Sequence, residues 1–279
     1  MTIKGSDVIK NDIRAICCDV DGTLVRDDKS LSDENCKWIH KAVHQAGIPF
    51  TVVSGRPLNG ILPFYQKIGI TGPVSCFNGG TLVDENGNIV DDHRMSYNLA
   101  LSICNIHDKY PNLDMIIFNG MKWYLETKDC YSYEKKKRVY NSDCLLGNLR
   151  SLLTEFDTNK IIFMGPSSSS LDAIMAEIGE TVGVENVTLY RNLDFLEVMP
   201  SGYDKSTSVD SLAKLLKIDV SQIMAIGDDY NDIAMLQKAG YPVAMANSVP
   251  EVKAIAKYVT DTNNNDGVAK AIQKLIFNL

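Results

Sequence analysis

Asp19 and Asp21 stand two residues apart, after an apolar run and directly before Gly22 and Thr23. The apolar residues before Asp19 predict a buried strand, and Gly22 marks a point where the chain can turn sharply. Open α/β sheets bind ligands at the carboxyl ends of their strands. Two carboxylates in one cleft repel each other and need a cation or a shared proton. The alternative is that the two acids only shape a turn, which Asp commonly does.

Polar residues follow three more predicted strands at the same kind of position. They are Ser54 after the strand 49–53, Asn78 after the strand 74–77, and Asp228 with Asp232 after the strand 223–226. Helical patterns alternate with these strands, which favours a parallel sheet with right-handed crossovers. Acids from two distant segments would then meet at one edge of the sheet.

The types of these side chains indicate phosphoryl transfer. Carboxylate oxygens without His or Cys among them suit Mg²⁺. Ser54 would add a hydroxyl and Lys205 a positive charge. Phosphoryl transfer needs a nucleophile in line, a cation, and donors for the equatorial oxygens. A carboxylate can be that nucleophile and form an aspartyl-phosphate, while the second carboxylate protonates the leaving alcohol and later activates water.

The alternation of strands and helices is interrupted between about residues 96 and 200. A hairpin is predicted over 81–90, and mixed helices and strands follow it. The first pattern returns with a helix over 206–216 and the strand 223–226. We therefore expect one α/β domain that is split in sequence by an inserted α+β domain.

Composition narrows the class of protein. The 279 residues are 45% hydrophobic and 23% charged with a net charge of −7, which argues against a nucleic-acid or anionic-membrane partner. No apolar run approaches the roughly 20 residues that span a bilayer, and the first twelve residues hold no hydrophobic signal core. The seven cysteines form no C-x-x-C pair, which is typical of reduced thiols. We expect a cytoplasmic protein.

Four segments together resemble the motifs of a known family. Asp19-Val20-Asp21-Gly22-Thr23 resembles the D-x-D-G-T motif of the haloacid dehalogenase-like phosphatases. Ser54-Gly55-Arg56 resembles their second motif, Lys205 their third, and Gly227-Asp228-Asp229-Tyr230-Asn231-Asp232 their fourth, in the family's order. Asn78-Gly79-Gly80 is similar to the N-G-A segment of the Cof-type sugar-phosphatase-like branch. The resemblance covers essentially the whole chain.

The resemblance implies an architecture and an activity. The fold would be a Rossmannoid α/β core with a parallel sheet, formed by residues 1–87 and 199–279. Residues 88–198 would be an inserted α/β cap of type IIB. The protein would be a Mg²⁺-dependent phosphatase that hydrolyses a small phosphorylated metabolite, and the resemblance favours a sugar phosphate as that metabolite. The protein would be a monomer or a weak homo-oligomer.

The resemblance also implies roles for single residues. Asp19 would be the nucleophile and Asp21 the general acid and base. The Asp19 carboxylate, the Asp21 backbone carbonyl and Asp228 would bind Mg²⁺, with Asp232 as a further acid beside the metal. The residues expected to bind the phosphate and the substrate are Thr23, Ser54, Gly55, Asn78, Lys205 and Asn231.

The chain departs from the family's pattern at two positions. Gly80 stands where alanine is usual, and Ala246, before Asn247, stands where glycine is usual.

Two other functions remain open. A phosphomutase uses a similar site but returns the phosphoryl group to a sugar. A receiver-like module also gathers Asp residues to bind Mg²⁺ and phosphate without catalysis, but it needs neither a cap nor an acid two residues after the nucleophile.

Overall fold

The computed structural model describes residues 12–279. Residues 1–11, which belong to the stretch predicted to hold no signal core, lie outside it. The described chain forms two compact units. The first contains residues 12–51, 67–72 and 213–279, and the second contains Val52–Gln66 and Pro73–Leu212. No helix within residues 12–279 is both long and apolar enough to cross a bilayer.

The first unit is built around a parallel sheet. Its strands are β1 (Ala15–Cys18), β12 (Ile223–Gly227), β13 (Tyr241–Ala244) and β14 (Tyr258–Val259). Its helices are α1 (Asp33–His44), α8 (Ile233–Lys238), α9 (Pro250–Ile255) and α10 (Gly267–Leu275), with the 3-10 helices η3 (Val220–Gln222), η4 (Tyr230–Asp232) and η5 (Asn263–Asn265). The strands run in the order β14-β13-β12-β1, and each neighbouring pair is parallel.

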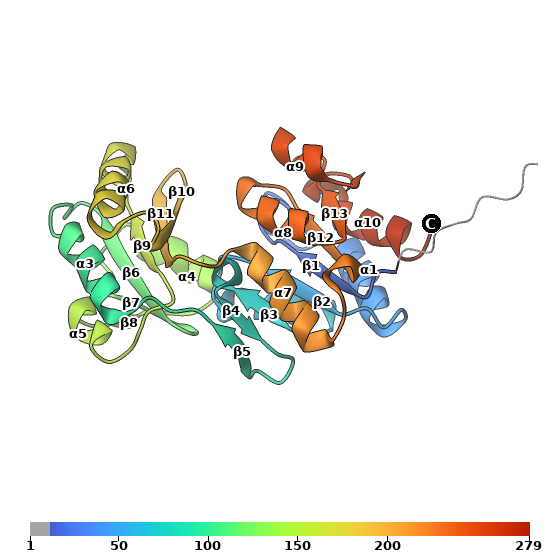
Figure 1. Cartoon of the computed structure of the whole chain (residues 1–279), viewed down its shortest axis with the longest axis horizontal. Coiled ribbons are helices and arrows are strands. Elements are labelled where there is room, and N and C mark those ends of the chain that lie inside the picture. The colour runs from blue at the N-terminus through green and yellow to red at the C-terminus, as the bar shows by residue number, and fades with distance from the viewer. Residues whose placement is uncertain (1–11) are drawn as a thin grey trace, which may run out of the picture. The chain divides into compact units, whose positions relative to one another are not determined.

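Burial explains why β1 and β12 are continuous apolar runs. Every residue of both strands is buried, as expected for parallel strands that are covered on both faces. Helix α1 begins at Ser32, whose side chain accepts a hydrogen bond from the Asn35 N–H. Trp38 of α1 packs edge-on against Phe277, just beyond α10. Helix α1 contacts α10, and helix α8 contacts α9 (Figure 1).

Three elements cross from one unit to the other along the chain. They are β2 (Phe50–Val53), α2 (Leu62–Ile68) and α7 (Lys205–Leu216). The Ile16 N–H of β1 bonds the Pro49 carbonyl just before β2. The last two residues of β2, Val52 and Val53, pair in parallel with β3 in the second unit.

The second unit holds the remaining elements. Its strands are β3 (Val74–Cys76), β4 (Thr81–Val83), β5 (Ile89–Asp92), β6 (Asp114–Asn119), β7 (Lys122–Leu125), β8 (Leu145–Leu146), β9 (Ile161–Met164), β10 (Val187–Arg191) and β11 (Phe195–Pro200). Its helices are α3 (Tyr97–His107), α4 (Tyr133–Tyr140), α5 (Leu149–Leu153) and α6 (Ser168–Val182), with the 3-10 helices η1 (Leu58–Gly60) and η2 (Phe77–Gly79). The pair β4 with β5 is antiparallel, which confirms the predicted hairpin. Strand β3 also pairs antiparallel with β4.

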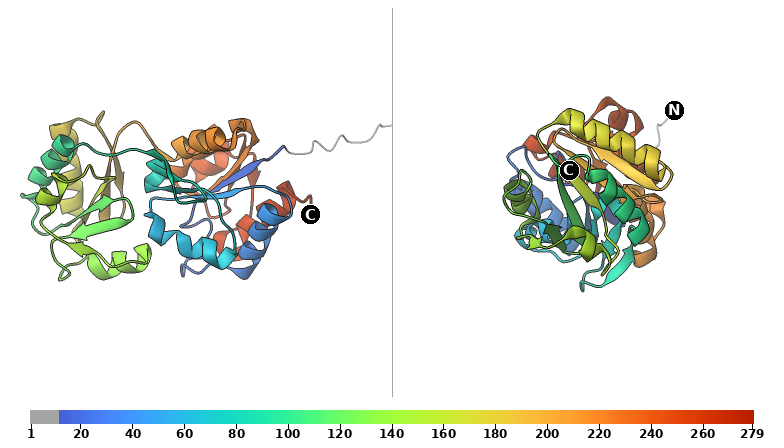
Figure 2. Two further views of the ribbon diagram at one scale, coloured as in Figure 1. Left: turned by 90° about the horizontal axis from the view of Figure 1, so that it is seen from below. Right: turned by 90° about the vertical axis from the view of Figure 1, so that its left-hand side faces the viewer.

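A six-stranded sheet in the order β10-β11-β9-β6-β7-β8 forms the other part of this unit. Helices α3 and α6 lie side by side over it (Figures 1 and 2). Alternate strand residues such as Ile117, Phe163 and Val198 belong to the same buried cluster as Ile103 and Ile174 of these helices. Because side chains alternate along a strand, the residues between them face away from the helices.

Candidate active site

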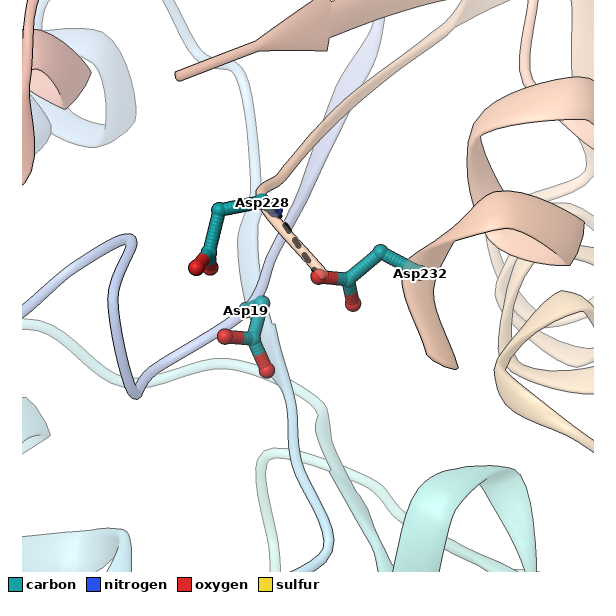
Figure 3. Close-up of side chains that lie close together, drawn as sticks. All are labelled: Asp19, Asp228 and Asp232. Carbon is teal, nitrogen blue, oxygen red and sulfur yellow. Dashed lines mark hydrogen bonds between the residues drawn. The ribbon is translucent and has the colours of Figure 1, made fainter. Parts of the chain in front are cut away.

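Three carboxylates lie together in the first unit (Figure 3). Asp19 follows β1, Asp228 follows β12, and Asp232 ends η4. One carboxylate oxygen from each lies within 4.8 Å of the others. The parallel register places Cys18 opposite Ile226, so both strands deliver their next residues to the same edge. The sequence-predicted convergence of these two segments is therefore present in the structure.

Hydrogen bonds fix Asp228 and Asp232 relative to each other. The Asp232 carboxylate accepts from the backbone N–H of Asp228 at 2.9 Å and from that of Asp229 at 3.1 Å. A Cβ on Gly227 would lie only 2.6 Å from the Asp232 Cβ, so glycine allows this close approach. The turn after β12 thus holds a fully buried acid against its own backbone.

Gly22 and Thr23 shape the other side of Asp228. The Thr23 hydroxyl donates to Asp228 Oδ1 at 2.6 Å. Gly22 has φ +87°, and a Cβ there would lie 2.2 Å from Asp228 Oδ2. Thr23, predicted to bind phosphate, therefore binds the Asp228 carboxylate in this structure, and Gly22 leaves the space that the carboxylate fills.

Asp21 differs from Asp19 in its surroundings. Asp19 is buried, whereas Asp21 is exposed and its carboxylate pairs with Lys29 Nζ at 2.9 Å. Its side chain is not part of the three-acid cluster. The two acids of the motif therefore have unlike environments: one faces its fellow carboxylates and the other a lysine.

Asn247 supports the loop at Gly22 from outside the four motifs. Asn247 Nδ2 donates to the Gly22 carbonyl at 2.8 Å, and its Oδ1 accepts from the Asn263 N–H. The sequence assigned Asn247 no role, and only the fold brings it to Gly22. Asn231, predicted to contact substrate, lies half-buried within η4 between Tyr230 and Asp232.

Ser54, Gly55 and Asn78 come together in the second unit. The Asn78 N–H donates to the Ser54 carbonyl at 2.9 Å. The Ser54 hydroxyl, almost fully buried, accepts from the Arg56 N–H at 3.3 Å. A Cβ on Gly55 would lie 3.1 Å from Asn78 Nδ2. The strand end of β2 and the turn after β3 therefore pack tightly against each other.

The segment before Lys205 packs on the same turn. Gly79 has φ +94°, and a Cβ there would lie 2.0 Å from the Asp204 carbonyl. Lys205 follows as the first residue of α7 and is 1% exposed. The predicted phosphate-binding residues Ser54, Gly55, Asn78 and Lys205 thus belong to one neighbourhood of the second unit.

Close packing also explains why residue 80 is a glycine. Its φ of −70° is open to any residue, but a Cβ would lie 2.9 Å from the ring and hydroxyl of Tyr203. A large aromatic side chain in this chain thus occupies the room that the family's usual alanine would need.

The donor set fits a small hard cation. Asp19, Asp228 and Asp232 offer only carboxylate oxygens, which Mg²⁺ prefers over nitrogen or sulfur ligands. Three negative charges within 4.8 Å repel one another, and a divalent ion relieves that repulsion. Acids at the carboxyl ends of parallel strands lie where open α/β folds bind their ligands.

Comparison with known proteins gives the family. The model of the haloacid dehalogenase-like hydrolases matches residues 16–272, so the chain belongs to this family. This confirms the resemblance drawn from the motifs, and with it an α/β enzyme fold.

Similar proteins agree with that assignment. The chain is 33% identical to a Streptococcus pyogenes protein named "Putative phosphatase M6_Spy0533", over 95% of this chain and 99% of the relative. It is 28% identical to the 5-amino-6-(5-phospho-D-ribitylamino)uracil phosphatase YcsE of Bacillus subtilis, over 98% of both. A haloacid dehalogenase-like hydrolase from Bacteroides thetaiotaomicron has a similar crystal structure, with a TM-score of 0.86, 26% identity, and coverage of 94% of this chain and 99% of that one.

Proposed function

We propose that this protein is a Mg²⁺-dependent phosphatase that hydrolyses a small phosphorylated metabolite through an aspartyl-phosphate on Asp19. The observation that carries the proposal is the buried Asp19 carboxylate within 4.8 Å of Asp228 and Asp232, at the end of a parallel strand. Membership of the hydrolase family and relatives that are named phosphatases support it.

Two acids would share the chemistry. An Asp19 oxygen attacks phosphorus, and the bond from phosphorus to the alcohol oxygen breaks. Asp21 gives its proton to that leaving oxygen. Asp21 then takes a proton from water as the water attacks phosphorus, and inorganic phosphate leaves with Asp19 restored.

The remaining acids would hold the cation. Asp19, Asp228 and Asp232, with the Asp21 carbonyl, are the proposed ligand set. Bound Mg²⁺ would neutralise the charge of the phosphate dianion among the carboxylates. Ser54, the Gly55 N–H and Lys205 would donate to the phosphate oxygens, and Asn78 and Asn231 would line the substrate site.

The substrate class is a phosphorylated sugar or sugar alcohol. The support is that one relative acts, by its name, on a phospho-ribityl compound.

Residues 88–198 would act as a cap that closes over the substrate and excludes bulk water, with residues 1–87 and 199–279 as the catalytic core. The proposed location is cytoplasmic.

A screen of phosphorylated metabolites for released phosphate tests the proposal. Wild-type protein with Mg²⁺ should release inorganic phosphate from a sugar or sugar-alcohol phosphate, and Asp19→Asn should release none. Free phosphate also distinguishes a phosphatase from a phosphomutase, which would yield an isomeric ester instead. Wild-type turnover by the Asp19→Asn variant would show that Asp19 is not the nucleophile.

A further inference from the structure

A buried ion pair lies in the second unit outside the proposed catalytic set. Lys160 Nζ lies 2.7 Å from Glu197 Oε1, and the side chains are 0% and 9% exposed. Glu197 is in β11 and Lys160 directly precedes β9, on the sheet face that points away from α3 and α6. A buried ion pair contributes little net stability because both charges lose their hydration. Its presence therefore calls for another purpose.

Lys160 reaches the second motif directly. Its Nζ donates to the Gly55 carbonyl at 2.8 Å. The ammonium also lies 5.7 Å from the ring centre of Phe77 and 5.2 Å from that of Phe118. The Lys160 side chain is 0% exposed, and the polar partners recorded for its ammonium within residues 12–279 are Glu197 and the Gly55 carbonyl.

Glu197 holds the other side of the same loop through Asn78. Its Oε2 accepts from Asn78 Nδ2 at 3.3 Å. A carboxylate only accepts hydrogen bonds, so it fixes the amide with its NH₂ group toward Glu197. Asn78 and Phe77 both have left-handed φ values, 55° and 53°. Such strained residues persist only where their surroundings hold them.

The result is a loop whose three carbonyls are all held. The Ser54 carbonyl accepts from the Asn78 N–H, the Gly55 carbonyl from Lys160, and the Arg56 carbonyl from the Phe77 N–H. In a trans peptide the carbonyl and the next N–H point in opposite directions. Holding the Ser54 and Gly55 carbonyls therefore turns the N–H groups of Gly55 and Arg56 to the opposite side. The Arg56 N–H donates to the Ser54 hydroxyl oxygen, which leaves the hydroxyl proton for a ligand.

We propose that Lys160 and Glu197 are positioning residues for the phosphate-binding loop at residues 54–56. They tie β9 and β11 to this loop and fix the direction of its donors, so that phosphate meets a preorganised set. This inference rests on the proposed phosphatase function. Neither the motifs nor the relatives' names assign a role to these two residues.

The test is a double variant, Lys160→Met with Glu197→Leu. Replacing both members of a buried pair with apolar residues is often neutral or stabilising, so the fold should be retained. A purely structural pair would then leave kinetics unchanged. We expect instead that KM for an aryl phosphate and the inhibition constant of inorganic phosphate both rise by about 10-fold or more, because the donors of the loop are misplaced. Circular dichroism and thermal unfolding confirm the fold.

Two further variants sharpen the result. Lys128→Met removes an exposed ion pair of similar length in the same unit, 2.8 Å to Asp143, and should leave KM and phosphate inhibition at wild-type values. Glu197→Gln nearly preserves volume but places an amide against Asn78 and Lys160, so it should weaken phosphate binding in the same direction. It also decides the matter if the double variant does not fold.

The outcomes separate the two proposals. Calorimetric binding of inorganic phosphate in Mg²⁺ needs no turnover, so it tests the loop even if wild-type protein hydrolyses nothing, a result that would overturn the proposed function alone. A folded double variant with wild-type KM and wild-type phosphate affinity would overturn the positioning role.

Discussion

Gly22→Ala should disrupt the candidate active site and also destabilise the fold. Gly22 has φ +87°, and its added Cβ would stand 2.2 Å from Asp228 Oδ2. Ordinary contact begins at 3.4 Å, so the oxygen must move by about 1 Å. The Asp228 side chain can only rotate away by giving up the 2.6 Å hydrogen bond from Thr23. The carboxylate then leaves the position it shares with Asp19 and Asp232.

Gly87→Ala is the matched control. Gly87 has nearly the same φ, +84°, but a Cβ there meets nothing within 4 Å. Both variants therefore incur the same backbone cost, roughly 1–2 kcal/mol for a residue other than glycine in the left-handed region. Gly22→Ala adds the lost hydrogen bond to a carboxylate, at most about 3 kcal/mol.

Urea unfolding and steady-state kinetics in a Mg²⁺ titration measure the two effects. We expect Gly87→Ala to keep wild-type kcat/KM. Gly22→Ala should lose about 100-fold in kcat/KM, as a misplacement of about 1 Å does, and should need more Mg²⁺ for half-maximal rate. If Gly22→Ala kept wild-type kcat and wild-type Mg²⁺ dependence, the reasoning that Gly22 makes room for a functional Asp228 would be refuted.

Three more predictions concern the metal, a packing contact and the thiols. EDTA should abolish phosphatase turnover and added Mg²⁺ should restore it, because the three carboxylates repel a phosphate dianion without a cation; full activity in EDTA would contradict this. Gly80→Ala should cost about 1–3 kcal/mol in urea unfolding through its clash with Tyr203, and Tyr203→Leu in the same chain should recover part of the loss. Burial raises the pKa of the Cys17 and Cys76 thiols to about 12. Unfolded thiols ionise near pH 8.5, so between about pH 9 and pH 11 the unfolded chain binds fewer protons and the free energy of unfolding should fall as pH rises. Replacing both thiols with alanine should flatten that slope, and an unchanged slope would exclude them as its source.

The strand ends could be predicted from sequence because their pattern is local. The apolar run before Asp19 and the run before Asp228 are both fully buried strands, and parallel pairing brings their ends together. The start of helix α1 is also a local feature, because serine is a favoured residue at the position before a helix and Ser32 stands there. These features depend on residue order and on the geometry of parallel sheets alone.

Other features depend on contacts between distant segments. The residue pattern between 119 and 159 does not by itself locate β7, α4, β8 and α5, which the structure has there. These segments are short or strongly polar, and packing stabilises them. Tyr140 of α4, for example, makes ring contacts with Phe118 and Trp123. Nothing local indicated that Tyr203 would fill the space beside Gly80.

The Lys160–Glu197 pair has a signal in the sequence. Lys160 opens an apolar strand and Glu197 interrupts another. Charges within buried strands are rare unless they are paired, so one of each sign in two such strands suggests an ion pair. The hydrogen bond from Lys160 to Gly55 still needed the structure, because 105 residues separate the two.

The central claim is that Asp19 becomes phosphorylated. Asp21→Asn should hydrolyse the intermediate slowly, while an aryl phosphate with a good leaving group can still form it without a proton from Asp21. Asp21→Asn protein is mixed with 4-nitrophenyl phosphate and Mg²⁺ and then quenched with acid. It should give a burst of about one nitrophenol per chain, and a peptide that carries the phosphoryl label on Asp19. The absence of both the burst and the label, or a label on another residue, would contradict the account.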